Sequence, residues 1–210
     1  MFEIIILLIF IINLPIIIFF KSITSLIGIF DKADNIRKLH KSDIPLFGGI
    51  LIILNLLFFL IIDSFLNLNL IKEIHSTREY FSFFFGCILF FILGVCDDKF
   101  DLSANKKLIL NFFILLFLIL LDDNLVIKQL SFSFLEAPID LRNFSHLFTI
   151  LCILLFSNAL NMFDGINLQV ATYCLIIFVI FLLKDIYLIL SVILICVLII
   201  FLIYNFFNKM

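Results

Sequence analysis

Three carboxylates stand close together where a long apolar stretch of the sequence gives way to polar residues. They are Asp97, Asp98 and Asp101, at spacings i, i+1 and i+4. Adjacent like charges repel one another and need a counter-charge. Mg²⁺ would supply it, with Mn²⁺ as an alternative, because hard divalent cations prefer oxygen ligands. The pattern therefore suits a divalent metal ion at this acidic block, against the alternative of a hydrated acidic helix end.

A second acidic pair, Asp122 and Asp123, offers a comparison because it also follows an apolar stretch. In the topology described below, this pair lies on the opposite side of the membrane from Asp97. We interpret it as a hydrated helix end and expect no catalytic role for it.

An amide-rich segment carries the next group of polar side chains. Asn158, Asn161 and Asp164 are spaced by three residues and would share one face of a helix. Such side chains are unfavourable in an apolar helix unless they face protein or a water-filled cavity. Gly165, which follows, can end the helix or admit a ligand close to the backbone. The pattern favours a ligand-binding face, with hydrogen bonding between helices as the alternative.

A basic segment precedes the apolar stretch that opens at Gly48. It contains Arg37, Lys38, His40 and Lys41. Basic side chains near lipid headgroups suit a phosphate, whether of a substrate or of a lipid. The alternative is the ordinary excess of positive charge on the cytoplasmic side of membrane proteins.

The composition indicates which elements must position these groups. The chain has 210 residues, of which 65% are hydrophobic and 14% are charged. Soluble domains are closer to half apolar and a quarter charged, and a chain of this length has too little interior to bury so many apolar side chains. The net charge of −2 gives no electrostatic case for a nucleic-acid partner. The chain is therefore expected to be an all-α, polytopic membrane protein.

About seven apolar segments are candidates for spans, because a helix needs roughly 20 apolar residues to cross the hydrocarbon core. The first has no basic residue before its apolar run, so we interpret it as a retained helix rather than a signal peptide. The seven segments are residues 2–20, 47–66, 80–96, 107–121, 146–163, 168–183 and 186–205.

The distribution of Lys and Arg predicts the orientation. Nine of the 14 fall on the side that holds residues 21–46, 97–107, 158–167 and the C-terminus. That side should be cytoplasmic, which puts the N-terminus outside and the C-terminus in the cytoplasm. The acidic, amide and basic groups then converge at one membrane–cytosol boundary. Such a combination suits phosphoryl transfer between a nucleotide compound and a lipid, where positioning and charge neutralisation supply most of the catalysis.

Three blocks of sequence resemble, in order, a known family. They are Arg37-Lys-x-His40 with Pro45-x-x-Gly48-Gly49, Asp97-Asp98-x-x-Asp101-Leu-Ser-Ala-x-x-Lys107, and Asn158-Ala-x-Asn161-x-x-Asp164-Gly165. The chain is thereby similar to the polyprenyl-phosphate N-acetylhexosamine-1-phosphate transferases (glycosyltransferase family 4), and the second block looks closest to the branch that transfers GlcNAc-1-phosphate.

The resemblance implies a reaction in which undecaprenyl phosphate attacks a UDP-N-acetylhexosamine. The products are a polyprenyl-pyrophosphate-sugar and UMP, in the initiating step of cell-envelope polysaccharide synthesis. It implies a plasma (inner) membrane enzyme with its active site on the cytoplasmic face, and it leaves both a monomer and a homodimer open. The implied catalytic residues are Asp97, Asp98 and Asp164, with Mg²⁺ at Asp97 and Asp98 and with Lys107, Asn158, Asn161, Arg37 and His40 at the substrates.

The sequence departs from the family pattern after Gly165. The family usually continues with x-Asp-Gly-Leu, whereas Asn167 stands here at the position of the Asp and Leu168 at that of the Gly. A later Gly-Asp-x-Gly block and a His-rich loop are expected in the family but not found within residues 1–210. We therefore interpret 1–210 as one membrane domain, the N-terminal part of a longer transferase fold. One alternative is a non-catalytic remnant that binds lipid phosphate or nucleotide. The other is an ion transporter, which the positions of the carboxylates near helix ends disfavour.

Overall fold

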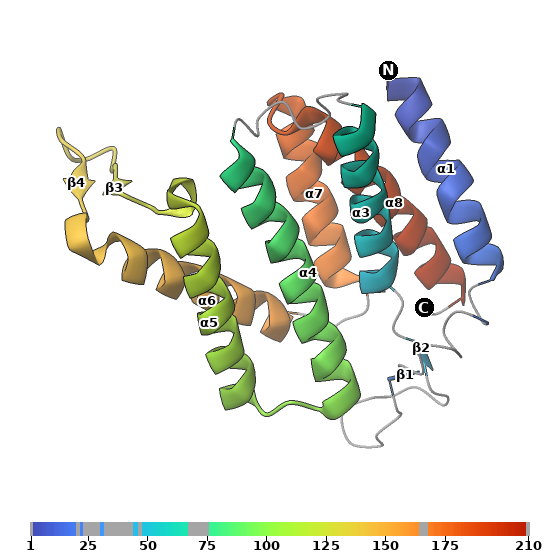
Figure 1. The fold of residues 1–210 in the computed structure, drawn as a ribbon, viewed down its shortest axis with the longest axis horizontal. Helices are drawn as coiled ribbons and strands as arrows, with labels where there is room; N and C mark the ends of the chain where they lie inside the picture. The colour runs from blue at the N-terminus through green and yellow to red at the C-terminus, as the bar shows by residue number, and fades with distance from the viewer. Residues whose placement is uncertain are drawn as a thin grey trace. The chain divides into compact units, whose positions relative to one another are not determined.

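The computed structural model of the protein describes residues 2–19, 22, 30–31, 44–45, 48–66, 76–163 and 168–208. Within these residues the chain is an all-α membrane protein with seven α-helices (Figure 1). The helices are α1 (Phe2–Ile18), α3 (Gly48–Leu66), α4 (Thr77–Phe100), α5 (Ala104–Leu121), α6 (Ser145–Phe163), α7 (Gln169–Leu183) and α8 (Leu188–Asn208). Two short antiparallel strand pairs and two 3₁₀ turns complete the fold: β1 (Phe30–Asp31) with β2 (Ile44–Pro45), β3 (Gln129–Leu130) with β4 (Ile139–Asp140), η1 (Asp123–Leu125) and η2 (Arg142–Phe144).

Each of the seven predicted apolar segments coincides with one α-helix. The prediction of 80–96 was too short, because α4 begins at Thr77 and continues to Phe100. The prediction of 107–121 was also short, because α5 begins at Ala104. Backbone hydrogen bonds carry a helix through polar residues that a count of apolar residues excludes.

Four helical segments are long and apolar enough to cross a membrane: Thr77–Phe100, Ala104–Leu121, Arg142–Phe163 and Leu188–Phe206. The apolar parts of α1, α3 and α7 are shorter among the described residues. The number of crossings and the orientation therefore remain predictions.

The chain forms two compact units. The first comprises residues 1–73, 94–101 and 165–210, and α8 is its central helix, in contact with α7, α3 and α1. The buried face of α8 follows helical spacing, which explains why this apolar helix can pack against three neighbours. That face contains Ile189, Ser191, Ile193, Leu194, Val197 and Leu198.

Two buried amides join α1 to α3 in the first unit. Asn13 Nδ2 donates to Asn55 Oδ1 at 2.9 Å, and Asn55 Nδ2 donates to Asn13 Oδ1 at 2.9 Å. The second amide hydrogens are donated to the carbonyl groups of Ile9 and Leu51, one turn earlier on each helix. All four amide hydrogens are thus used, which makes burial of these polar groups compatible with an apolar surrounding.

Gly48, the first residue of α3, allows close packing against α8. A Cβ atom at this position would lie 2.6 Å from Cε2 of Phe201. By contrast, a Cβ atom at Gly94 in α4 would meet nothing within 4 Å. Of these two glycines, only Gly48 lies where an added methyl group would press on a neighbouring side chain.

Gly48→Ala is expected to lower the free energy of unfolding by about 1–3 kcal/mol, because the added methyl group displaces the Phe201 ring. Gly94→Ala is the matched control. It should raise the free energy of unfolding by roughly 0.5–1 kcal/mol, because alanine has fewer backbone conformations than glycine in the unfolded chain. SDS-induced unfolding of the protein in micelles measures both changes. Adding Phe201→Leu to Gly48→Ala should restore part of the loss, and equal effects of the two alanines would contradict the packing role.

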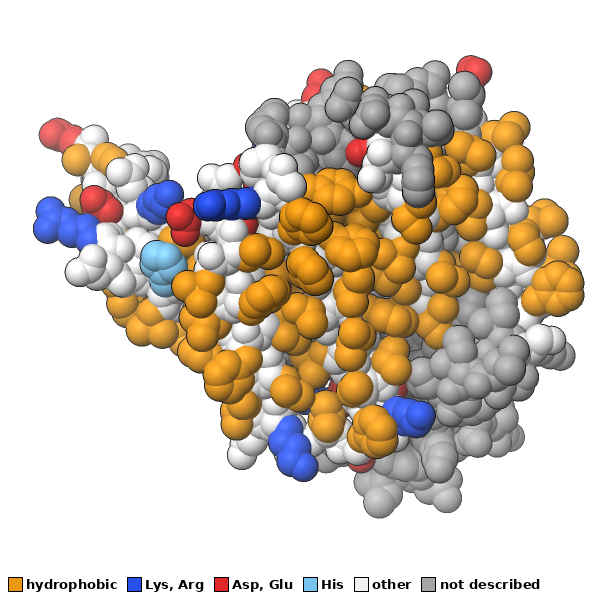
Figure 2. Space-filling model, in the orientation of Figure 1, with side chains coloured by type: hydrophobic (Ala, Val, Ile, Leu, Met, Phe, Trp, Pro, Cys, Tyr) orange, Lys and Arg blue, Asp and Glu red, His pale blue; other side chains and the backbone are white. Residues whose placement is uncertain are grey.

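The second unit comprises residues 74–93 and 102–164 and contains most of α4 together with α5 and α6. Its core is formed by Leu115, Ile119, Val126 and Ile150, so that α5 packs against α6. The rings of Phe85 and Phe117 join α4 to α5 at 6.2 Å between centroids. Figure 2 shows apolar side chains along the middle of α4 and α5 and charged side chains toward their ends, the pattern expected of helices in a bilayer.

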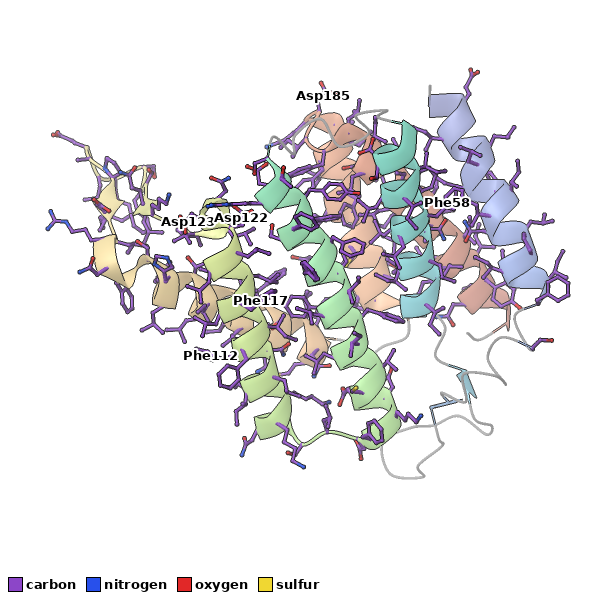
Figure 3. All side chains as sticks on the ribbon, in the orientation of Figure 1. Phe58, Phe112, Phe117, Asp122, Asp123 and Asp185 are labelled. Atoms are coloured by element: carbon purple, nitrogen blue, oxygen red, sulfur yellow. The ribbon has the colours of Figure 1, made fainter. Side chains whose placement is uncertain are left out.

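The prediction for Asp122 was wrong, because this carboxylate is buried rather than hydrated, with 4% of its surface exposed. Figure 3 places Asp122 and Asp123 together at the end of α5. The Ser82 hydroxyl donates to Asp122 Oδ2 at 3.0 Å, and the Asn124 backbone N–H donates to Asp122 Oδ1 at 3.0 Å. Two donors thus replace water at the two carboxylate oxygens. Asp123 is exposed, as expected for a hydrated helix end.

Asp122→Ala is expected to destabilise the protein by about 1–3 kcal/mol, because it leaves the Asn124 backbone N–H without its acceptor, although the Ser82 hydroxyl keeps the Glu79 carbonyl at 2.9 Å. Asp123→Ala should change stability by no more than about 0.5 kcal/mol, as is usual for exposed positions. The two unfolding free energies, measured in the same micelles, test this difference. A similar change for both variants would show that the buried hydrogen bonds contribute little.

Candidate functional site

The acidic residues Asp97 and Asp98 occupy the last turn of α4, in the first unit. Neighbouring residues on a helix point about 100° apart. Asp97 is half-buried and its Oδ1 atom is shielded from solvent, whereas Asp98 is exposed. The pair therefore presents one carboxylate toward the protein and one toward the surroundings of the helix end.

Asp101 ends α4. Its backbone is left-handed, with φ 49°, and its N–H donates to the Asp97 carbonyl at 2.8 Å. This is the conformation that commonly closes a helix, and Asp tolerates it better than most non-glycine residues. Asp101, the third carboxylate of the acidic block, thus has a structural role: its backbone ends the helix that carries Asp97 and Asp98.

Lys107 lies in the first turn of α5, in the second unit, and is half-buried. Its backbone N–H donates to the carbonyl of Ser103, the residue that precedes the helix. The neighbouring Lys106 is exposed. The two adjacent lysines thus differ in burial. Lys107, the half-buried one, is the lysine that the sequence predicts at a phosphate or nucleotide.

The amides Asn158 and Asn161 lie near the C-terminal end of α6, also in the second unit. Both are exposed, and their spacing of three puts them on one helical face. Exposure disfavours the alternative that they join described helices by buried hydrogen bonds. They remain available to a ligand or to another part of the protein.

Arg37, His40 and Asp164 lie outside the described residues. Asp97 and Asp98 belong to one unit, whereas Lys107, Asn158 and Asn161 belong to the other. The convergence of all three blocks on one site therefore stays a prediction from sequence.

Leu168 has an unusual backbone at the position where the family pattern has glycine. Its φ of 70° is left-handed, and it stands directly before α7. Its carbonyl accepts from the backbone N–H and the hydroxyl of Thr172. A residue with a Cβ atom is strained in this conformation, whereas glycine adopts it readily.

Leu168→Gly is expected to exceed Leu168→Ala in stability by about 1 kcal/mol, since only glycine relieves the left-handed strain. Both variants remove the half-buried leucine side chain, so their difference isolates the backbone contribution. Unfolding by SDS in micelles measures it. Equal stability of the two variants would mean that Leu168 is not held left-handed in solution.

Sequence reasoning missed three features: the Asn13–Asn55 pair, the burial of Asp122 and the left-handed Leu168. A signal was present for the first, because each asparagine is isolated in a strongly apolar helix. The second depended on Ser82, a residue 40 positions away in sequence. For Leu168, the sequence showed the mismatch with the glycine of the family pattern, but it did not show the left-handed backbone angle.

The number of carboxylates at the end of α4 limits the kind of magnesium site that they could form. Among the residues that the structure describes, no group of three or more His, Cys, Asp or Glu side chains gathers as a metal cage. Mg²⁺ is usually held by one or two carboxylates together with water and substrate phosphates. An ion held by Asp97 or Asp98 would therefore be shared with a substrate rather than enclosed by protein.

Comparison with known proteins adds an independent observation. Residues 80–209 match the family model described as glycosyl transferase family 4. The chain is 28% identical over 147 residues to a probable undecaprenyl-phosphate N-acetylglucosaminyl 1-phosphate transferase of Bacillus subtilis, covering 70% of the chain and 38% of that protein.

Two further relatives are named undecaprenyl-phosphate alpha-N-acetylglucosaminyl 1-phosphate transferase. The protein of Escherichia coli K12 is 28% identical over 71% of the chain and 37% of its own length. The protein of Yersinia pestis is 30% identical over 67% of the chain and 35% of its own length. The chain thus spans little more than a third of the length of these relatives.

Proposed function

The chain belongs to glycosyl transferase family 4, and from this premise we propose that the protein transfers an N-acetylhexosamine-1-phosphate group from a UDP-sugar to undecaprenyl phosphate. The observation that carries the proposal is the match over residues 80–209, which includes Asp97, Asp98, Lys107, Asn158, Asn161 and Asp164. The names of the relatives support undecaprenyl phosphate as the acceptor and GlcNAc as the sugar.

The proposed reaction exchanges one pyrophosphate (phosphoanhydride) bond for another. An oxygen of the lipid phosphate forms a bond to the sugar-linked phosphorus. The bond between that phosphorus and the bridging oxygen of the UDP breaks, and UMP leaves with that oxygen. The products are undecaprenyl-pyrophosphate-N-acetylhexosamine and UMP, the first lipid-linked intermediate of a cell-envelope polysaccharide.

Charge neutralisation is the main task for the protein in such a reaction. In this proposal Asp97 and Asp98 would hold Mg²⁺ or Mn²⁺, which would supply positive charge beside the phosphates of the two anionic substrates. Lys107 places a positive charge at a phosphate, because a lysine ammonium acts there as a point charge. Asn158 and Asn161 donate hydrogen bonds to the nucleotide. Asp164 is the third essential acid, and Arg37 and His40 contact a phosphate.

The end of α4 suits this role because of its place in the fold. Asp97 and Asp98 lie in the last turn of an apolar helix that is long enough to cross a membrane. Carboxylates at such a helix end lie at the boundary where a lipid phosphate and a water-soluble nucleotide can meet. We place this boundary on the cytoplasmic face of the plasma membrane, because nine of the 14 Lys and Arg residues are assigned to that side.

The test is the release of UMP from UDP-GlcNAc by membranes that contain the protein, with undecaprenyl phosphate and Mg²⁺ supplied. Release should require both substrates and should be matched by a lipid-linked sugar. UDP-GalNAc in a parallel reaction identifies the hexosamine. If neither UDP-sugar gives UMP while the membranes still bind UDP-sugar or lipid phosphate, the protein is a binding remnant, the alternative that Leu168 in place of glycine favours. Absence of both turnover and binding would reject the transferase and the remnant together.

A further inference from the structure

The segment between α5 and α6 carries an exposed apolar tip. Its base is the pairing of β3 with β4, in which Gln129 faces Asp140 and Leu130 faces Ile139. Residues 131–138 connect the strands, and the Leu135 N–H donates to the Phe132 carbonyl at 3.0 Å in a tight turn. In Figure 1 this hairpin stands clear of α5 and α6. Its tip therefore needs some other cover for its apolar side chains.

The exposed side chains of the tip are large and aromatic. Phe134 is 79% exposed, Phe132 41% and Leu135 42%. The rings of Phe132 and Phe134 lie 5.2 Å apart between centroids and form one patch. Exposed aromatic patches of this kind mark an interaction surface rather than a solvated loop.

The hairpin is rooted in helices that lie in the membrane. The Ile127 N–H donates to the hydroxyl of Thr149 on α6 at 2.9 Å, and Val126 is buried in the core between α5 and α6. On the other side, η2 runs directly into the apolar segment Arg142–Phe163. Both ends of the hairpin thereby adjoin helical segments that are long and apolar enough to cross a membrane, Ala104–Leu121 and Arg142–Phe163.

The apolar surface continues from the helices toward the hairpin. Leu120 near the end of α5, Phe144 in η2 and Leu147 in α6 are exposed, as lipid-facing residues of a membrane protein should be. Lys128 and Arg142 flank the hairpin base and suit the phosphates of lipid headgroups. Continuity with the lipid-facing surface and the flanking cations both indicate lipid as the partner.

We propose that the β3–β4 hairpin is a membrane-contact element that inserts Phe132, Phe134 and Leu135 into the headgroup–acyl boundary of the adjacent leaflet. The hairpin then acts as a second attachment of the second unit to the bilayer, beside its helices. This inference does not depend on the proposed reaction.

The sequence makes a direct test available, because the chain contains no tryptophan. Phe134→Trp introduces a single fluorophore at the tip, in the full chain reconstituted into vesicles of phosphatidylethanolamine and phosphatidylglycerol. Brominated lipids should quench it most strongly with bromine roughly 5–10 Å below the headgroup level, and iodide in the water should quench it weakly. Phe113→Trp, at a 59% exposed position within α5, is the reference for a lipid-facing site.

A second variant isolates the apolar tip. Phe134→Trp combined with Phe132→Ser and Leu135→Ser should lose quenching by brominated lipid and gain quenching by iodide, while the Phe113→Trp reference stays unchanged when it carries the same two serines. Strong iodide quenching of Phe134→Trp alone would overturn the proposal, because the tip would lie in water. Protection of Phe134→Trp from both quenchers would also overturn it, because protein would then cover the tip.

Discussion

Asp98→Asn is expected to reduce the rate of sugar-phosphate transfer by about 10²–10⁴-fold, the range typical of losing a charged catalytic group. The amide has nearly the size and shape of the carboxylate, so the end of α4 should keep its structure. What is lost is the negative charge that holds the divalent cation in our proposal. UMP release at saturating UDP-GlcNAc and undecaprenyl phosphate measures the change.

Asp123→Asn is the matched control for this experiment. Asp123 is also an exposed aspartate near the C-terminal end of an apolar helix, but we place it on the opposite side of the membrane. Its rate should equal that of the unaltered protein. If Asp98→Asn also keeps its rate, the assignment of the acidic block as the metal site is wrong.

Asp101→Asn separates the two roles that the acidic block combines. Asparagine tolerates the left-handed backbone of a helix end about as well as aspartate. If Asp101 serves to end α4, as its φ of 49° indicates, its asparagine variant should retain most of the activity. A loss as large as that of Asp98→Asn would instead place the Asp101 carboxylate at the substrates.

Asn13→Leu is expected to destabilise the protein by about 1–3 kcal/mol, because the Asn55 amide stays buried after its partner is removed. Values toward the lower end are typical of hydrogen bonds between membrane helices. Asn55→Leu should have a similar effect for the same reason. The free energy of unfolding in SDS-containing micelles measures each variant.

The double variant Asn13→Leu with Asn55→Leu decides whether the two amides act as a pair. Removing both polar groups eliminates the unsatisfied one, so the double variant should be more stable than the sum of the single effects predicts. Simple additivity would show that each asparagine is stabilised by its own helix, through the carbonyl groups of Ile9 and Leu51. Loss of transfer activity in a stable double variant would add a positioning role for the pair.

The helices could be predicted from sequence because each one is a long apolar run, and only their polar ends were placed imprecisely. The turn at Asp101 and the start of α5 at Ala104 depend on backbone angles that residue types leave open. The prediction for Asp122 failed for a related reason. A carboxylate at a helix end is hydrated unless a distant donor reaches it, and here Ser82 does so from α4.

For the candidate site too, the residue types could be predicted from sequence, whereas their surroundings could not. The residue types at Asp97, Asp98, Lys107, Asn158 and Asn161 suffice to predict phosphate and metal chemistry, and the structure adds their local burial. It shows, for example, that Asp97 and Asp98 differ in exposure although they are neighbours in sequence. Adjacent residues of a helix face different directions, so identical side chains acquire different surroundings.

The Asn13–Asn55 pair also has a consequence for the order in which the helices assemble during synthesis. Synthesis of a chain runs from its N-terminus, so α8, which contacts α1, α3 and α7, emerges well after α1 and α3. About 130 residues separate Asn55 from the start of α8, an interval of roughly 7–26 s at about 5–20 residues per second. During that interval α1 and α3 are in the membrane without their central partner. Their reciprocal amide hydrogen bonds need no later part of the chain, so the pair can keep these two newly made helices together until α8 arrives.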